Sequence, residues 1–91
     1  MMPVEPQLLS AVRLVTEDQQ CRGIFDAILR AGGKASGWSV TKMLDQNPQA
    51  VEAGLGKMRA HNIVESTGGP GLEGYYYLTP LGFQVRSTML K

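Results

Sequence analysis

A single β-rich stretch interrupts a chain whose other segments carry helical patterns. Ile63-Val64-Glu65 favours a strand, residues 66–71 (Ser-Thr-Gly-Gly-Pro-Gly) favour a turn, and Tyr75-Tyr76-Tyr77-Leu78 favours a second strand. Together these segments predict a β-hairpin over residues 63–78. We therefore predict a protein that is mainly α with one small β-hairpin.

Two helices are predicted before this hairpin, over residues 5–15 and 17–31. In the first, the apolar positions 8, 11, 12 and 15 recur at helical spacing. The second begins with Thr16 as N-cap and Gln19 as its capping-box partner, and it stops at Gly32-Gly33. It carries an amphipathic stripe, typical of a helix packed on a core, made of Cys21, Ile24, Phe25, Ile28 and Leu29.

Residues 39–61 are predicted to form two short helices joined by a turn. Residues 34–38 favour a short extended or turn segment, after which Ser39 can cap a helix. Asn47-Pro48 then starts the next helix, because Asn is a good N-cap and Pro is favoured at the first helical position. Asn62 follows this helix, where a left-handed residue is favoured. The side chains expected to point inward from the two helices are Val40, Met43, Leu44, Val51, Leu55 and Met58.

A last helix is predicted over residues 80–90, because Thr79-Pro80 repeats the cap-plus-proline start. Its inward residues are expected to be Leu81, Val85, Met89 and Leu90. Trp38 is expected to fill the space between the hairpin and the second helix. Of the three consecutive tyrosines, one or two should pack inward, because side chains alternate along a strand.

Composition indicates one soluble domain spanning residues 1–91. The chain has 43% hydrophobic and 19% charged residues and a net charge of +1, and its apolar stretches are too short for a membrane span. Its start lacks the basic and long apolar regions of a secretory signal. The lone Cys21 cannot form an internal disulfide, which favours a cytoplasmic location and a buried structural thiol.

The sequence predicts neither an enzyme nor a metal or cofactor site. One His and one Cys are too few for a structural zinc site, and no catalytic constellation can be assembled from the scattered acids. Gly68-Gly69-Pro70-Gly71 lacks the Lys-Ser/Thr of a phosphate loop, so it is interpreted as a turn. Residues 34–61 are mildly basic, with Lys34, Lys42, Lys57 and Arg59 against Asp45 and Glu52.

Two segments carry a resemblance to a known family. Residues 50–58 (Ala-Val-Glu-Ala-Gly-Leu-Gly-Lys-Met), followed by Arg59-Ala60-His61 and Asn62-Ile63-Val64, match a recognition helix that reads T-V-S-x-x-L-x-x-L and then G-L-V. Residues 77–82 (Tyr-Leu-Thr-Pro-Leu-Gly) match Y-x-L-T-x-x-G. The span from Ser39 to Gly82 thus resembles the winged-helix DNA-binding domain of small regulators of the MarR and PadR kind. This resemblance implies a winged helix-turn-helix fold, with residues 63–78 as the wing.

The resemblance also implies a DNA-binding site. Side chains at the start of the recognition helix would meet base edges in the major groove, and the matching positions are Gln49, Ala50, Glu52 and Ala53. Phosphates would be contacted from the helix-turn-helix by Ser39, Thr41, Lys42, Lys57 and Arg59. The wing departs from the family, because no Arg or Lys occurs between His61 and Val85 while Glu65 and Glu73 do.

Two classes of function follow from these patterns. The first is a transcriptional regulator that binds double-stranded DNA as a homodimer through residues 5–15 and 80–90, which both carry apolar stripes. The second is a winged-helix protein-interaction module that does not bind DNA, which the non-basic wing and Glu52 favour.

Overall fold

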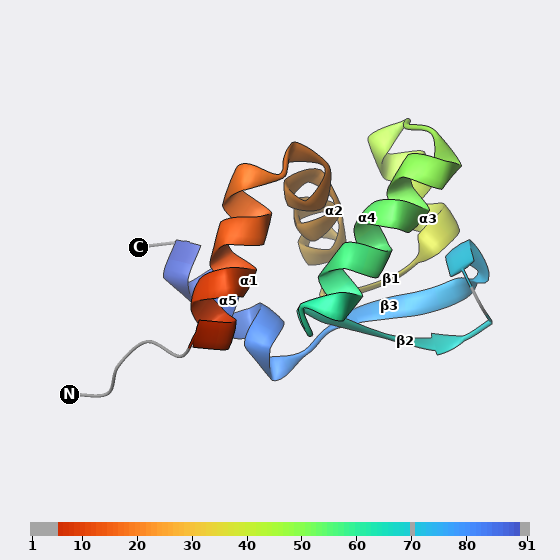
Figure 1. Cartoon of the computed structure of the whole chain (residues 1–91). Coiled ribbons are helices and arrows are strands. Elements are labelled where there is room, and N and C mark those ends of the chain that lie inside the picture. The colour runs from red at the N-terminus through yellow and green to blue at the C-terminus, as the bar shows by residue number, and fades with distance from the viewer. Residues whose placement is uncertain (1–5, 70, 90–91) are drawn as a thin grey trace.

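Five helices and a small sheet make up the computed structural model, which describes residues 6–69 and 71–89 (Figure 1). The predictions for Glu5 and Leu90 lie outside the described residues. The elements in chain order are α1 (Pro6–Glu17), α2 (Gln19–Arg30), β1 (Lys34–Ser36), α3 (Gly37–Leu44), α4 (Pro48–Ala60), β2 (Val64–Gly68), the 3₁₀ turn η1 (Gly71–Glu73), β3 (Gly74–Leu78) and α5 (Pro80–Met89).

The sheet has three antiparallel strands in the order β1-β3-β2. Strands β2 and β3 form the expected hairpin, with Val64 opposite Leu78 and Gly68 opposite Gly74. Strand β1 pairs with the other edge of β3, with Lys34 opposite Tyr77 and Ser36 opposite Tyr75. The extended segment foreseen near residue 34 is thus a third strand, and the two-stranded hairpin is part of a larger sheet.

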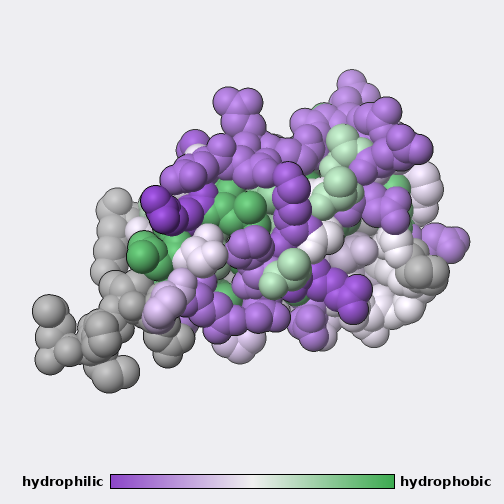
Figure 2. All heavy atoms as spheres, in the orientation of Figure 1, coloured by the Kyte–Doolittle hydropathy of each residue, from purple (hydrophilic) through white to green (hydrophobic). Residues whose placement is uncertain are grey.

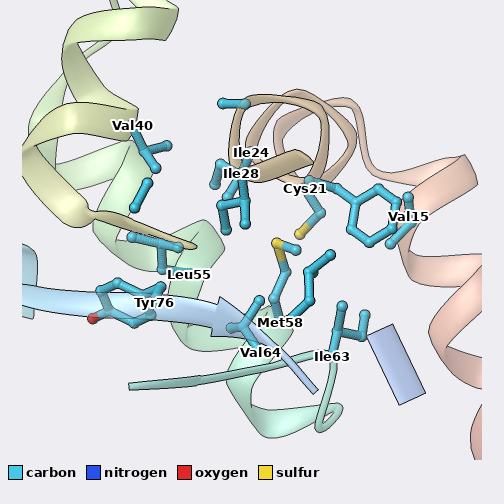
Figure 3. Close-up of a cluster of buried hydrophobic side chains, with 14 of the residues drawn as sticks. Val15, Cys21, Ile24, Ile28, Val40, Leu55, Met58, Ile63, Val64 and Tyr76 are labelled. Carbon is cyan, nitrogen blue, oxygen red and sulfur yellow. The ribbon is translucent and has the colours of Figure 1, made fainter. Parts of the chain in front are cut away.

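The core lies between the helices and the inner face of the sheet (Figure 3). Ile24 and Ile28 from α2 meet Leu55 and Met58 from α4, and all four are fully buried. Burying one side chain of this size contributes about 1.5–3 kcal/mol relative to leaving it exposed. The expected inward stripes of α2 and α4 are therefore confirmed. The sheet adds further buried side chains, namely Ala35, Val64, Tyr76 and Leu78.

Two predicted helix starts are wrong by a few residues. Thr16 lies inside α1, where its hydroxyl donates to the carbonyl of Val12 (2.8 Å), and Asp18 caps α2 instead. The Asp18 carboxylate accepts from the backbone N–H groups of Gln20 and Cys21, at 3.0 and 3.1 Å. A carboxylate at this position also interacts favourably with the positive end of the helix dipole, which a hydroxyl does not.

The second displaced start is that of α3, which Ser36 caps rather than Ser39. The Ser36 hydroxyl oxygen accepts from the backbone N–H of Ser39 at 3.1 Å, so the helix begins at Gly37. The caps at Asn47 and Thr79 are as expected, with side chains that accept from the N–H groups of Gln49 (2.8 Å) and Gly82 (3.0 Å). Asn62 adopts the expected left-handed conformation, with φ of 61°.

Trp38 and Met43 are exposed, contrary to prediction, at 52% and 44%. The reason lies at Gly37, where a Cβ atom would come within 2.5 Å of the Leu72 Cα atom. Helix α3 and the turn after β2 approach so closely that Leu72 closes the gap and no space is left for an indole. Met43 lies on the outer face of the same short helix, because Val40 and Thr41 already occupy the inner one.

Candidate nucleic-acid interface

The start of α4 and the turn that joins β2 to β3 lie at one end of the molecule (Figure 1). Helices α1 and α5 lie side by side at the opposite end. In the view of Figure 2, hydrophilic residues cover most of the surface near α3 and α4. This arrangement leaves the first turns of α4 open to solvent, where a large partner can reach them.

The four residues expected to read bases all lie on the exposed part of α4. Gln49 and Ala50 are in its first turn, followed by Glu52 and Ala53, and each is exposed. The core face of the same helix is buried, so the amphipathic pattern fixes which side faces out. The structure thus brings these residues together on one accessible helix face.

A depression of about 410 Å³ separates the start of α4 from the wing. Trp38, Gln49 and Glu52 line one side, and Leu72 and Glu73 line the other. Trp38 was not predicted to belong to this surface, because nothing local in the sequence shows that Leu72 fills the space beside Gly37. The depression between α4 and the wing therefore combines one exposed aromatic ring with two carboxylates.

The residues expected to contact phosphates are not equally available. Ser39, Lys42 and Arg59 are exposed. Thr41 is only 8% exposed, and its hydroxyl donates to the carbonyl of Gly37 at 2.8 Å. This corrects the expectation for Thr41. Its buried hydroxyl is already bonded to the backbone of α3 and is not available to a phosphate.

The ammonium group of Lys57 forms an ion pair with Asp18. Its Nζ lies 3.1 Å from the Asp18 Oδ2 atom, at the N-terminus of α2. The hydrogen bond to Asp18 raises the pKa of Lys57. The pKa of Asp18 is lowered, first by the backbone N–H of Cys21 and then by Lys57. Lys57 therefore ties α4 to α2, on a part of α4 remote from its first turn.

Cys21 is fully buried, as expected, and its thiol lies 3.8 Å from the carbonyl of Gly54. Burial, together with the nearby Asp18 carboxylate, raises the pKa of this thiol to about 11. A thiol that stays protonated at neutral pH is a poor nucleophile. Residues 6–69 and 71–89 also hold no group of three or more His, Cys, Asp or Glu side chains placed to bind a metal.

No protein-family model matches the chain, and no curated protein is similar to it in sequence. Among solved structures, the chain is similar to TubR bound to 24 bp of tubC from Bacillus thuringiensis serovar israelensis pBtoxis. The two superpose with a TM-score of 0.76 over 99% of this chain and 97% of that chain, at 13% sequence identity. This similarity confirms the predicted fold class, while membership of the MarR or PadR family stays a prediction. None of the described helices has the length and apolarity to cross a membrane.

Proposed function

We propose that this protein binds double-stranded DNA as a transcriptional regulator, with α4 in the major groove. The observation that carries the proposal is the open face of α4 at one end of the same fold that, in TubR, is bound to 24 bp of tubC. The exposed residues Ala50, Ala53 and Gly56 are small, so the helix backbone can approach the floor of a groove closely. The proposal is of a binding protein and not of an enzyme.

Two side chains on this face have the chemistry to distinguish bases. The Gln49 amide can pair with the N6 and N7 atoms of adenine, and the Glu52 carboxylate can accept from the N4 amino group of cytosine. The methyl groups of Ala50 and Ala53 can contact a thymine methyl. Specificity would thus rest on a few contacts, each contributing about 1–3 kcal/mol of discrimination.

We further propose a homodimer formed through α1 and α5. Leu9 and Phe83 expose 53% and 46% of their surface at this end of the molecule. A depression of about 310 Å³ lies beside Phe83, with Leu8 of α1 and Pro80 of α5 in its lining. A two-fold axis through this apolar surface would present two α4 helices to two half-sites of one duplex.

The experiment that tests the proposed function is selection of duplexes from a pool of random sequence, followed by affinity measurements on the enriched duplex. We expect an inverted repeat to be enriched. Gln49→Ala should then lose preference at one base pair in each half-site, by about 1–3 kcal/mol, because one bidentate contact is removed. Gln19→Ala, an exposed glutamine at the start of α2, is the matched control and should bind as the wild type does.

A second candidate is a winged-helix module that binds another protein. It is favoured by the depression between α4 and the wing, where Glu52 and Glu73 flank the exposed Trp38. Carboxylates repel phosphates, whereas they attract basic side chains of a protein. If no duplex is enriched and the wild type does not bind DNA at low salt, this candidate replaces the first.

A further inference from the structure

A second groove, of about 490 Å³, lies beside β1 and the face of α3 that points away from the core. Its lining contains neither a residue of α4 nor a residue of the turn between β2 and β3. The residues that line it are Ala31, Lys34, Ala35, Ser36, Ser39, Lys42, Met43 and Tyr75. Two of these side chains are lysines and none is acidic, so the groove has a positive charge that the wing lacks.

The lysines come from different elements and share one apolar surface. Lys34 lies on β1 with its Nζ atom 5.3 Å from the centroid of the Tyr75 ring on β3. Lys42 and Met43 lie on α3, and both are exposed. A cation above an aromatic face is favourably placed, so the Tyr75 ring holds Lys34 near the groove while leaving its charge available.

A hydroxyl group adds a directional donor between the lysines. The Ser36 hydroxyl donates to the Ser39 oxygen at 2.8 Å. Ser39 therefore acts as the acceptor in this pair, and its own proton can be donated to an anionic oxygen. Ammonium and hydroxyl donors beside an apolar wall match a sugar–phosphate chain, in which charged oxygens alternate with apolar sugar surfaces.

The other Lys and Arg side chains of residues 34–61, Lys57 and Arg59, do not line this groove. Lys57 pairs with Asp18 at 3.1 Å. Burial raises the pKa of the Tyr76 hydroxyl, and the charges of Arg59 and Glu52 act on it in opposite directions, so Arg59 lies in a region that also holds a carboxylate. Lys34 and Lys42 are thus the two cations of this part of the chain that line a groove with no carboxylate in it.

We propose that the Lys34–Lys42 groove binds the phosphate backbone of the duplex beside the base pairs that α4 reads. This inference rests on the proposed function. Because α3 packs directly against α4, a duplex that receives α4 in its major groove brings a backbone strand toward α3. The backbone is held on the β1–α3 side by Lys34, Ser39 and Lys42, and not by the wing.

The test uses the full chain and a fluorescein-labelled duplex of 24 bp, the length bound to TubR, with the sequence enriched by selection. Lys34→Gln and Lys42→Gln remove one charge each and keep side chains of similar length. Affinity is measured by anisotropy at about 50 and 200 mM salt. Affinity falls as salt rises, and each lost phosphate contact should make the slope of log affinity against log salt shallower by about 0.9. The loss of affinity between the two salt concentrations therefore becomes about three- to four-fold smaller.

Arg22→Gln is the matched control, because Arg22 is an exposed cation on α2 outside the lining of the groove. It should leave the slope unchanged. Circular dichroism melts check that all three variants fold, which is expected for exposed positions. In the double variant Lys34→Gln/Lys42→Gln, the slope should be reduced by the sum of the reductions in the two single variants, because the two contacts are to different phosphates.

Three results would overturn the inference, and they are distinguishable from one another. If the wild type binds DNA but both lysine variants keep its slope, the backbone does not lie in this groove and the proposed function survives. If Arg22→Gln changes the slope equally, the effect is one of total charge. If the wild type binds no duplex but binds polyglutamate through Lys34 and Lys42, the groove serves an acidic protein segment and the proposed function also fails.

Discussion

The two ends of this molecule expose different kinds of surface, although both are built from short amphipathic helices. At the α1–α5 end, Leu9 and Phe83 expose apolar side chains, and Phe83 lines a shallow depression together with Leu8. At the α3–α4 end, most exposed residues are polar, charged or very small, and the large apolar exceptions are Trp38 and Met43. This difference is the basis of our proposal that one end associates with a second copy and the other meets DNA.

The largest expected effect comes from placing a charge on the apolar end. Phe83→Glu should convert the proposed dimer to a monomer, since it puts a carboxylate into the proposed interface. Affinity for an inverted repeat should then fall by about 100-fold or more, because the two half-sites are no longer bound by one linked molecule. Analytical ultracentrifugation and anisotropy on the same sample measure both changes.

Two further variants make this result decisive. Leu9→Glu should act in the same way from α1, which guards against a folding defect specific to Phe83. Tyr77→Glu removes another exposed aromatic residue, but from the outer face of the sheet, and it should remain a dimer. The proposed distinction between the two ends would fail if the Phe83→Glu variant remained a dimer. It would also fail if the wild type were already a monomer at tens of micromolar (a concentration chosen for the test).

The next effect concerns how the wing is held against the α3–α4 end. Gly37→Ala should lower the free energy of unfolding by about 1–3 kcal/mol, the usual cost of overpacking a tight contact. The added methyl group would meet the backbone of Leu72 at 2.5 Å, and backbone cannot turn aside as a side chain can. Urea titration measures the change. Gly56→Ala is the control, because a Cβ there meets nothing within 4 Å and Ala favours helix.

The smallest expected effect distinguishes the wing from the rest of the end that we propose to meet DNA. Glu73→Lys removes a repulsive charge and adds an attractive one, so binding to duplexes of unrelated sequence should strengthen a few-fold at low salt. Glu17→Lys on α1 is the comparison, since Glu17 is exposed and its Oε2 atom lies 3.7 Å from the Nε atom of Arg13. Equal gains from both variants would show that total charge, and not the position of the wing, determines non-specific binding.

Much of the fold could be predicted from the sequence because its signals are local. The stripe from Cys21 to Leu29 and the Asn47-Pro48 start depend on helical spacing and capping alone, and both agree with the structure. The third strand could not be found in this way, because β1 has only three residues and depends on pairing with β3, about 40 residues further along the chain.

The site was predictable where it depended on helix periodicity and not where it depended on long-range packing. The exposed face of α4 follows from the positions of Val51, Leu55 and Met58. Trp38 was assigned to the core because nothing local reveals that Gly37 lets Leu72 fill that space. That Lys34 and Lys42 line the same groove could not be predicted either, because it depends on the packing of β1 beside α3.

The central claim is that the α3–α4 end of the protein is the surface that meets DNA, and Trp38 allows a direct test. It is the single Trp of the chain, and it lies in the depression next to Gln49 with 52% of its surface exposed. Acrylamide quenching of its fluorescence is measured with and without a duplex whose binding is followed by anisotropy. The account predicts efficient quenching in the free protein and clear protection in the complex. Equal quenching in the two states, with the duplex demonstrably bound, would place DNA elsewhere and contradict the claim.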